Sequence, residues 1–308
     1  MELPQLEGDV FLTDAGIETD LIFHHGIELP LFASFPLHDD PQTVDLLRTY
    51  FVEFIELGAR HNIGMVLETA TWRASSDWGD QLGYDAASLY DVNRRAVDLL
   101  LELRDQRAGA PVVVSGCVGP RGDAYSDLGR MTAAAAAEYH VAQIAALASA
   151  GADIVGAYTL TNVAEAIGIV EAARSCAIPS VISFTVETDG VLPDGTRLAD
   201  AIEAVDNATA SEALYFLVNC AHPDHVEPAL SDRSAALGRL RGVRANASRH
   251  SHAELDDSSE LDDGDPAEFG AQLAALHRRL PHLTILGGCC GTDRRHIAEI
   301  AIAVKNDR

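Results

Sequence analysis

The sequence is poor in positive charge. It has 22 lysine and arginine residues against 47 aspartate and glutamate residues, and Lys305 is its only lysine. The formal net charge is -25. Nucleic acids and anionic membranes are bound through clustered positive charge, so we expect neither as a partner. The negative field weakly favours a small cationic ligand instead.

Long apolar runs are also absent. No stretch approaches the ~20 apolar residues of a membrane span, and the acidic amino terminus, Met1–Glu7, lacks the basic and apolar regions of a signal peptide. With 47% hydrophobic and 22% charged residues, the composition is that of a soluble globular protein. We expect a cytoplasmic protein with a single domain over residues 1–308. The sequence gives no indication of oligomeric state.

The sequence also lacks the glycine-rich motifs of nucleotide-binding loops. It contains eight short runs rich in β-branched residues, which alternate with segments whose apolar residues have helical spacing. The predicted strands are Val10–Thr13, Met65–Thr69, Val112–Cys117, Ile154–Tyr158, Val181–Val186, Tyr215–Asn219, Gly242–Asn246 and Thr284–Gly288. The predicted helices are Thr43–Gly58, Leu89–Arg107, Thr132–Ala150, Asn162–Arg174, Leu198–Thr209 and Pro266–Arg279. This alternation predicts an α/β fold, a (β/α)8 TIM barrel. A doubly wound open sheet is the alternative.

Cysteine is scarce, but three of the five cysteines stand at predicted strand ends. Cys220 ends the sixth strand, and the neighbouring pair Cys289 and Cys290 ends the eighth. Because the carboxyl ends of parallel barrel strands share one face, the three thiols emerge together. Three thiolates suit Zn²⁺ and leave its fourth tetrahedral position free for a substrate atom. His222 and His225 are alternative ligands.

The other two cysteines, Cys117 and Cys176, are predicted to be core thiols, since no export signal points to a disulfide framework. Three long segments are predicted as loops at the strand carboxyl ends: residues 72–84, residues 120–130, and residues 251–266 with seven acidic side chains in sixteen positions. The acidic segment is either a solvated surface loop or a lid over the site. His250 and His252, within or beside it, show no spacing that identifies a site.

Three motifs resemble the homocysteine S-methyltransferase family. They are the glycine-rich turn Gly287–Thr292 with the helix that follows, the strand end Val218–Cys220, and the opening segment Leu12–Thr19. The resemblance extends over nearly the whole chain. It implies a Zn²⁺ ion held by Cys220, Cys289 and Cys290, at which an acceptor thiol is bound and loses its proton.

The resemblance also implies the substrates. The acceptor would be homocysteine, giving methionine, and the donor would be a small onium compound. S-methylmethionine is favoured because no cobalamin-binding or folate-binding domain follows the barrel, with S-adenosylmethionine or betaine as alternatives. A catalytically idle barrel that binds zinc or a thiol is a further hypothesis.

Asp14 matches the acidic residue of the family that would receive the amino group of homocysteine. Glu18, Tyr158 and Gly288 complete the predicted substrate-binding set, with Glu68 and Trp72 as further candidates at the barrel mouth. Tyr158 stands where the family has a glutamate that helps to bind the ammonium group, and a tyrosine cannot supply that negative charge. The alternative hypothesis is therefore a methyltransferase or demethylase that uses a different thiol.

Overall fold

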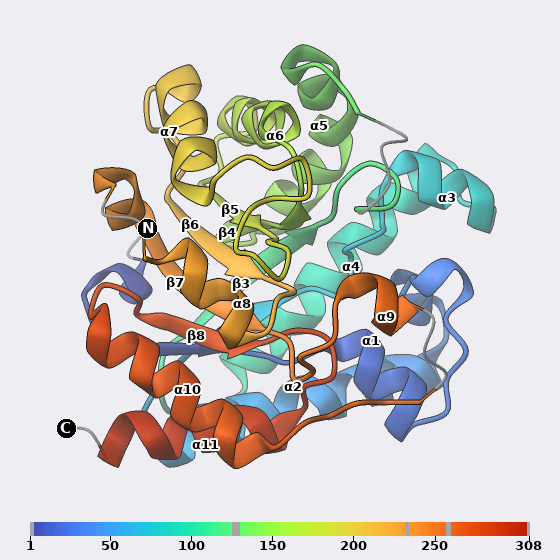
Figure 1. Ribbon diagram of the computed structural model, residues 1–308. Coiled ribbons are helices and arrows are strands. Elements are labelled where there is room, and N and C mark those ends of the chain that lie inside the picture. The colour runs from blue at the N-terminus through green and yellow to red at the C-terminus, as the bar shows by residue number, and fades with distance from the viewer. Residues whose placement is uncertain (1–2, 125–129, 232–233, 257–259, 307–308) are drawn as a thin grey trace.

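The eight strands form a closed parallel barrel in chain order (Figure 1). The computed structural model describes residues 3–124, 130–231, 234–256 and 260–306. Each strand pairs with the next, and β1 closes the barrel against β8. The strands are β1 (Phe11–Thr13), β2 (Gly64–Glu68), β3 (Val112–Val118), β4 (Ile154–Leu160), β5 (Ser180–Phe184), β6 (Tyr215–Asn219), β7 (Leu240–Ala245) and β8 (Ile285–Gly288). The predicted TIM barrel is confirmed, and the open sheet is wrong.

Helices surround the barrel and bury its strands from outside (Figure 1). The long ones are α2 (Pro41–His61), α4 (Ala86–Asp105), α5 (Ala133–Ala150), α6 (Val163–Ser175), α7 (Leu198–Thr209), α10 (Pro266–Arg279) and α11 (Arg294–Asn306). The short ones are α1 (Ile17–Thr19), α3 (Ser76–Leu82), α8 (Pro223–Ala229) and α9 (His252–Asp256). Single turns of other helix types cover Pro4–Leu6, Asp20–His24, Pro30–Phe32, Phe35–Asp39 and Ala235–Arg239. No described helix is both long and apolar enough to cross a membrane.

All six predicted helices are present, because their local signals agree with their packing. The Thr132 hydroxyl accepts a hydrogen bond from the backbone N–H of Ala135 and begins α5. The Asn162 side chain caps α6 in the same way through the N–H of Glu165. Both residues are therefore caps, and each helix starts one residue later than predicted.

Two of the segments predicted as loops contain short helices. Within residues 72–84 lies α3, and within residues 251–266 lies α9. Residues 125–129 of the predicted 120–130 loop and residues 257–259 of the acidic segment lie outside the described part of the chain. Helices of five to seven residues are marginal on their own and form through tertiary contacts, so sequence spacing does not reveal them.

Most of the core lies in two apolar layers. The larger one fills the space between strands and helices, and a smaller cluster fills the barrel interior. Cys117 belongs to the interior cluster, as predicted. Cys176 is only partly buried at the end of α6, so its prediction as a core thiol is wrong. The assignment of residues 1–308 to a single domain stays a prediction.

Candidate metal centre

The three cysteines predicted as ligands converge at the carboxyl end of the barrel. Their sulfur atoms all lie within 4.8 Å of one another, and the Sγ atoms of Cys220 and Cys290 are 3.5 Å apart. A tetrahedral zinc site with Zn–S bonds of about 2.3 Å has sulfurs roughly 3.8 Å apart. The donor set therefore fits a single tetrahedral ion with one position left open.

The two histidines considered as alternative ligands lie outside this group. Over the described residues, the cluster of possible metal ligands consists of the three cysteines alone. His222 begins α8 instead, where its Nδ1 accepts a hydrogen bond from the N–H of Asp224 at 3.1 Å. Burial lowers the pKa of His222 to about 4, so the ring is neutral at physiological pH.

The end of β7 holds the cysteine segments on either side of it. The N–H of Cys220 donates to the carbonyl of Arg244, and the N–H of Cys289 donates to the carbonyl of Ala245. The N–H of Ala247 donates to the carbonyl of Cys290. Cys220 also has a left-handed backbone with φ 58°, which costs about 1–2 kcal/mol for a residue with a Cβ. This strained turn lets the chain leave the β6 pleat where its thiol joins the other two.

The pKa values of the neighbouring thiols Cys289 and Cys290 are shifted in opposite directions. Hydrogen bonds from Cys220 and Cys290 hold the pKa of Cys289 well below its ordinary value, and the charge of Arg244 lowers it further. Hydrogen bonds with Cys220 and Cys289 raise the pKa of Cys290 well above its ordinary value, and burial raises it further. A bound cation would stabilise the thiolate form of all three cysteines.

Asn219 supports the centre from the last position of β6. Its Oδ1 accepts hydrogen bonds from the N–H of Thr159 at 2.8 Å and from the Ser183 hydroxyl at 2.7 Å. Its Nδ2 donates to the Thr159 hydroxyl at 2.9 Å and reaches Cys289 Sγ at 3.8 Å. The side chain is buried, so it ties β4, β5 and one thiol into a fixed arrangement.

We expect Asn219→Ala to weaken metal binding about 10–100-fold, the usual effect of removing a group that orients a ligand. Stability should also fall by roughly 2–3 kcal/mol, because buried polar groups of Thr159 and Ser183 lose their partner. Competitive chelator titration measures the affinity, and urea unfolding measures the stability. Ser183→Ala is the matched control, since it removes one bond of the same network and leaves the amide contact to Cys289. Equal affinities for both variants would contradict this role.

Asp14, predicted to receive an amino group, is buried and already paired with a cation. Its Oδ1 accepts a hydrogen bond from Arg244 Nη2 at 2.5 Å, and its Oδ2 accepts one from the N–H of Glu68 at 3.0 Å. Burial raises the pKa of Asp14 to about 7, although Arg244 lowers it. The carboxyl therefore titrates near neutrality.

Tyr158 and Glu68 lie against the same arginine. The Tyr158 hydroxyl donates to Glu68 Oε1 at 2.5 Å, and Arg244 Nη1 is 3.7 Å from that oxygen. The guanidinium carbon of Arg244 is 4.8 Å from the centre of the Tyr158 ring. The structure brings Glu68, predicted at the mouth, together with Tyr158, predicted to bind substrate, and their roles stay predictions. The arginine between them was not predicted from the sequence.

Asp14, Glu68, Tyr158 and Arg244 form the floor of the site, beneath the cysteines. The remaining predicted substrate residues lie around this floor. Burial raises the pKa of Glu18, whose Oε1 accepts a hydrogen bond from the Ser34 hydroxyl at 2.8 Å. The Gly288 carbonyl accepts a hydrogen bond from Arg244 Nε at 3.2 Å, and a Cβ at Gly288 would lie 2.1 Å from Thr292 Oγ1. This glycine is thus required by close packing. Trp72 Nε1 donates to the Tyr158 carbonyl at 3.3 Å.

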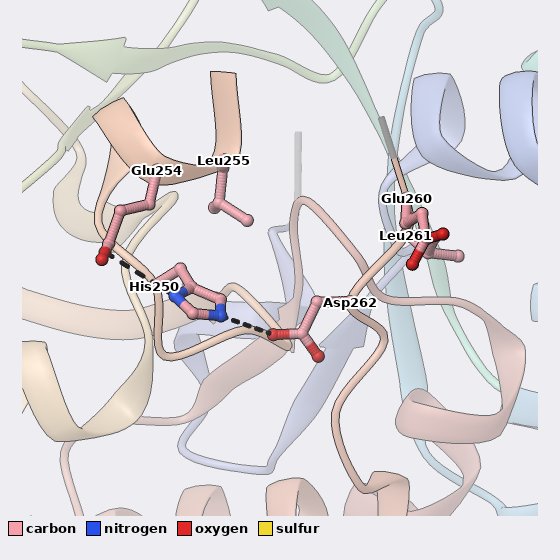
Figure 2. Close-up of a pocket in the computed structure, with 6 residues that line it drawn as sticks. All are labelled: His250, Glu254, Leu255, Glu260, Leu261 and Asp262. Carbon is pink, nitrogen blue, oxygen red and sulfur yellow. Dashed lines mark ion pairs between the residues drawn. The ribbon is translucent and has the colours of Figure 1, made fainter. Parts of the chain in front are cut away.

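Two cavities adjoin the acidic segment, and one of them reaches the centre. One, of about 320 Å³, is lined by His250, Glu254, Leu255, Glu260, Leu261 and Asp262 of the acidic segment (Figure 2). Figure 2 shows His250 between Glu254 and Asp262, at 3.7 and 3.8 Å. A much smaller one is lined by Cys220 together with His222, His225 and His252. The acidic segment therefore does not simply lie in solvent but borders the cysteines.

Sequence reasoning missed two residues of this site. Burial lowers the pKa of His252 to about 4, while the charge of Cys289 and a hydrogen bond with the Cys220 backbone raise it. This histidine had no recognisable spacing. Arg244 did leave a signal, because a charged residue inside the apolar run Gly242–Asn246 must have a buried partner.

The chain is similar to known proteins over nearly its whole length. The family model for homocysteine S-methyltransferase matches residues 11–304. Homocysteine S-methyltransferase of Escherichia coli (strain K12) is 26% identical, with 95% of this chain and 94% of the relative covered. Homocysteine S-methyltransferase 4 of Zea mays is 25% identical, with 97% and 90% covered.

The fold is also that of solved structures. The oxidized form of the homocysteine methyltransferase MmuM from Escherichia coli superposes with a TM-score of 0.74 at 24% identity, covering 99% of this chain and 98% of the other. A metallated form of MmuM gives 0.72 at 22% identity, covering 98% and 97%. The match of the family model over nearly the whole chain places the chain in the homocysteine S-methyltransferase family, whose members are methyltransferases.

Proposed function

We propose that this protein transfers a methyl group from a small onium donor to a thiol acceptor at a Zn²⁺ ion held by Cys220, Cys289 and Cys290. The convergence of the three sulfurs at the barrel mouth is the observation that carries the proposal. When bound, the ion stabilises the thiolate form of the acceptor at its open position. A free thiol with a pKa of about 8.5 would otherwise be mostly protonated at neutral pH.

The transfer itself is an in-line displacement. The acceptor sulfur, its proton released to solvent, forms a bond to the methyl carbon. The bond between that carbon and the donor sulfur breaks, and its electron pair stays on the donor, which becomes a neutral thioether. Opposite charges of thiolate and onium centre are lost together, so a poorly hydrated site favours the step.

The surroundings of the cysteines support this chemistry. Cys220, Asn219 and Arg244 are buried, which keeps much of the water away from the sulfurs. The acidic cavity in Figure 2 shares His250 with the small cavity that Cys220 lines, and its acidic side chains would favour a cationic donor. S-methylmethionine remains the donor we propose, and a cytoplasmic location stays a prediction.

Two acceptors are in question. The names of the relatives favour homocysteine. The second candidate is a different thiol, and the specific observation in its favour is that Asp14 already pairs with Arg244 while Tyr158 supplies no charge.

The direct test is mass spectrometry on reduced, zinc-loaded protein given S-methylmethionine with an isotopically labelled methyl group and a panel of small thiols, homocysteine included. We expect a labelled thioether with at least one thiol and none with metal-depleted protein. The absence of any labelled thioether while zinc stays bound would contradict the proposal and favour the idle barrel.

A further inference from the structure

The carboxylates at the barrel mouth outnumber the cation between them. Burial raises the pKa of Asp14, Glu18 and Glu68, and the charge of Arg244 lowers the pKa of each. Three carboxylates thus share one guanidinium, which leaves two negative charges uncompensated within this group when all three are ionised. Uncompensated negative charge is costly in a poorly hydrated site, so the mouth favours a ligand that brings a positive charge.

Two of the three carboxylates are shielded from a ligand. Asp14 and Glu68 are only 2% and 5% exposed. Asp14 accepts hydrogen bonds from Arg244 Nη2 at 2.5 Å and from the N–H of Glu68 at 3.0 Å. Glu68 Oε1 accepts the hydroxyl of Tyr158 at 2.5 Å, and its Oε2 is fully buried, 3.1 Å from the place of a Cβ on Gly156. Both carboxylates therefore belong to the packed floor.

Glu18 is the accessible carboxylate of the three. It lies in α1 and is partly exposed. Its Oε1 accepts a hydrogen bond from the hydroxyl of Ser34 at 2.8 Å, and Ser34 is itself buried with 2% exposure. A buried hydroxyl thus fixes one oxygen of Glu18, while the exposed part of the side chain stays within reach of a ligand.

The turn that carries Glu18 packs against the cysteine turn after β8. The N–H of Gly291 donates to Thr19 Oγ1 at 3.2 Å, and a Cβ at Gly16 would lie 2.5 Å from the carbonyl oxygen of Cys289. After burial, the charge of Cys289 also raises the pKa of Glu18, which agrees with this proximity. A small thiol that binds beside Cys289 would therefore bring an ammonium group a few bonds away within reach of Glu18.

We infer that Glu18 determines the specificity of the acceptor subsite by receiving the ammonium group of an amino-acid thiol, and that Ser34 positions it. The inference rests on the proposed function, because that function makes the mouth an acceptor subsite. It gives Asp14 a different part from the one predicted for it: Asp14 is the counter-ion of Arg244 in the floor, and Glu18 contacts the substrate.

Binding of two matched thiols tests the inference without turnover. The full-length protein is loaded with Co²⁺, and changes in the visible absorption of the ion report thiol binding. The probes are homocysteine and deamino-homocysteine, which has hydrogen in place of the amino group. We expect the wild-type protein to bind homocysteine at least about tenfold more tightly, because a hydrogen-bonded charge pair forms only with the ammonium.

Glu18→Gln keeps the shape of the side chain and removes its charge. It should lower the ratio of the two affinities by about tenfold through homocysteine alone, with deamino-homocysteine bound as before within about twofold. Ser34→Ala should lower the ratio by roughly threefold, because Glu18 keeps its charge and loses its orientation. Glu28→Gln, a change of an exposed glutamate, is the control and should keep the wild-type ratio.

Three results would overturn the inference: equal affinities of the wild-type protein for both thiols, a ratio unchanged by Glu18→Gln, or equal weakening of both thiols, which a merely structural role would produce. If Glu18→Gln fails to bind Co²⁺, the wild-type ratio and Ser34→Ala decide.

The proposed function can fail separately. Homocysteine binding that depends on Glu18, without methyl transfer to either thiol, would contradict the proposed function alone. Methyl transfer to homocysteine by Glu18→Gln with the wild-type KM would contradict this inference alone.

Discussion

Cys220→Ala should abolish both metal retention and methyl transfer. The substitution removes one of three sulfurs that lie within 4.8 Å of one another, and the two neighbouring cysteines of the β8 end cannot close a tetrahedral site by themselves. An acceptor thiol would then stay protonated, with only about 3% thiolate at pH 7 for a pKa near 8.5. Loss of positioning adds to this deficit.

We expect kcat/KM to fall by at least about 1000-fold, which corresponds to roughly 4 kcal/mol of lost transition-state stabilisation. Metal content after dialysis, measured by atomic emission, and labelled methyl transfer are the two readouts. Cys176→Ala is the matched control, because Cys176 is partly buried at the end of α6 and lies outside the group of three sulfurs. A metal-free Cys220→Ala protein with wild-type rates would refute the mechanism, and so would one that retains a full equivalent of zinc.

Gly242→Ala should be the most destabilising single-methyl change in the barrel wall. A Cβ at Gly242 would lie 1.9 Å from the carbonyl oxygen of Ile285 and 2.7 Å from its carbonyl carbon. These are backbone atoms of the neighbouring strand in the Gly242–Ile285 register pair, so no side chain can turn aside. Only a separation of β7 from β8 relieves the overlap.

Overpacking of this kind costs about 3 kcal/mol, the upper end of its usual range. In thermal unfolding we expect a melting temperature roughly 4–5 °C lower. Gly238→Ala serves as the control, since Gly238 lies in the single turn Ala235–Arg239 and a Cβ there would meet no atom within 4 Å. Similar melting temperatures for the two variants would show that the strands can part at little cost.

The sequence predicts the barrel well because its signals are local and repeated. Tyr215–Asn219 is found as predicted, and so are the helices Leu198–Thr209 and Pro266–Arg279. The convergence of the three cysteines could be predicted from the topology. Parallel strands end on one face of the barrel, so Cys220 after β6 and Cys289 and Cys290 after β8 emerge on the same side.

The substrate floor could not be predicted in the same way. Arg244 and Asp14 are 230 positions apart, and no spacing rule connects a strand residue to a partner at that distance. In the sequence, Asp14 looks like a carboxylate available to a substrate. In the folded chain, Arg244 is its counter-ion. The short helices α8 and α9 escaped prediction because tertiary contacts, rather than propensity, hold them.

The closure of the barrel gives the metal centre a place in the order of folding. β1 meets β8 through only two register pairs, Phe11 with Ile285 and Leu12 with Leu286. The N–H of Gly16 reaches Thr292 across 276 positions, and the sulfurs of Cys220 and Cys290 meet across 70. Contacts between such distant segments form late, because long loops must close first. A growing chain thus acquires its three-sulfur site only when its last strand arrives, and a metal ion bound there would join that strand to the end of β6.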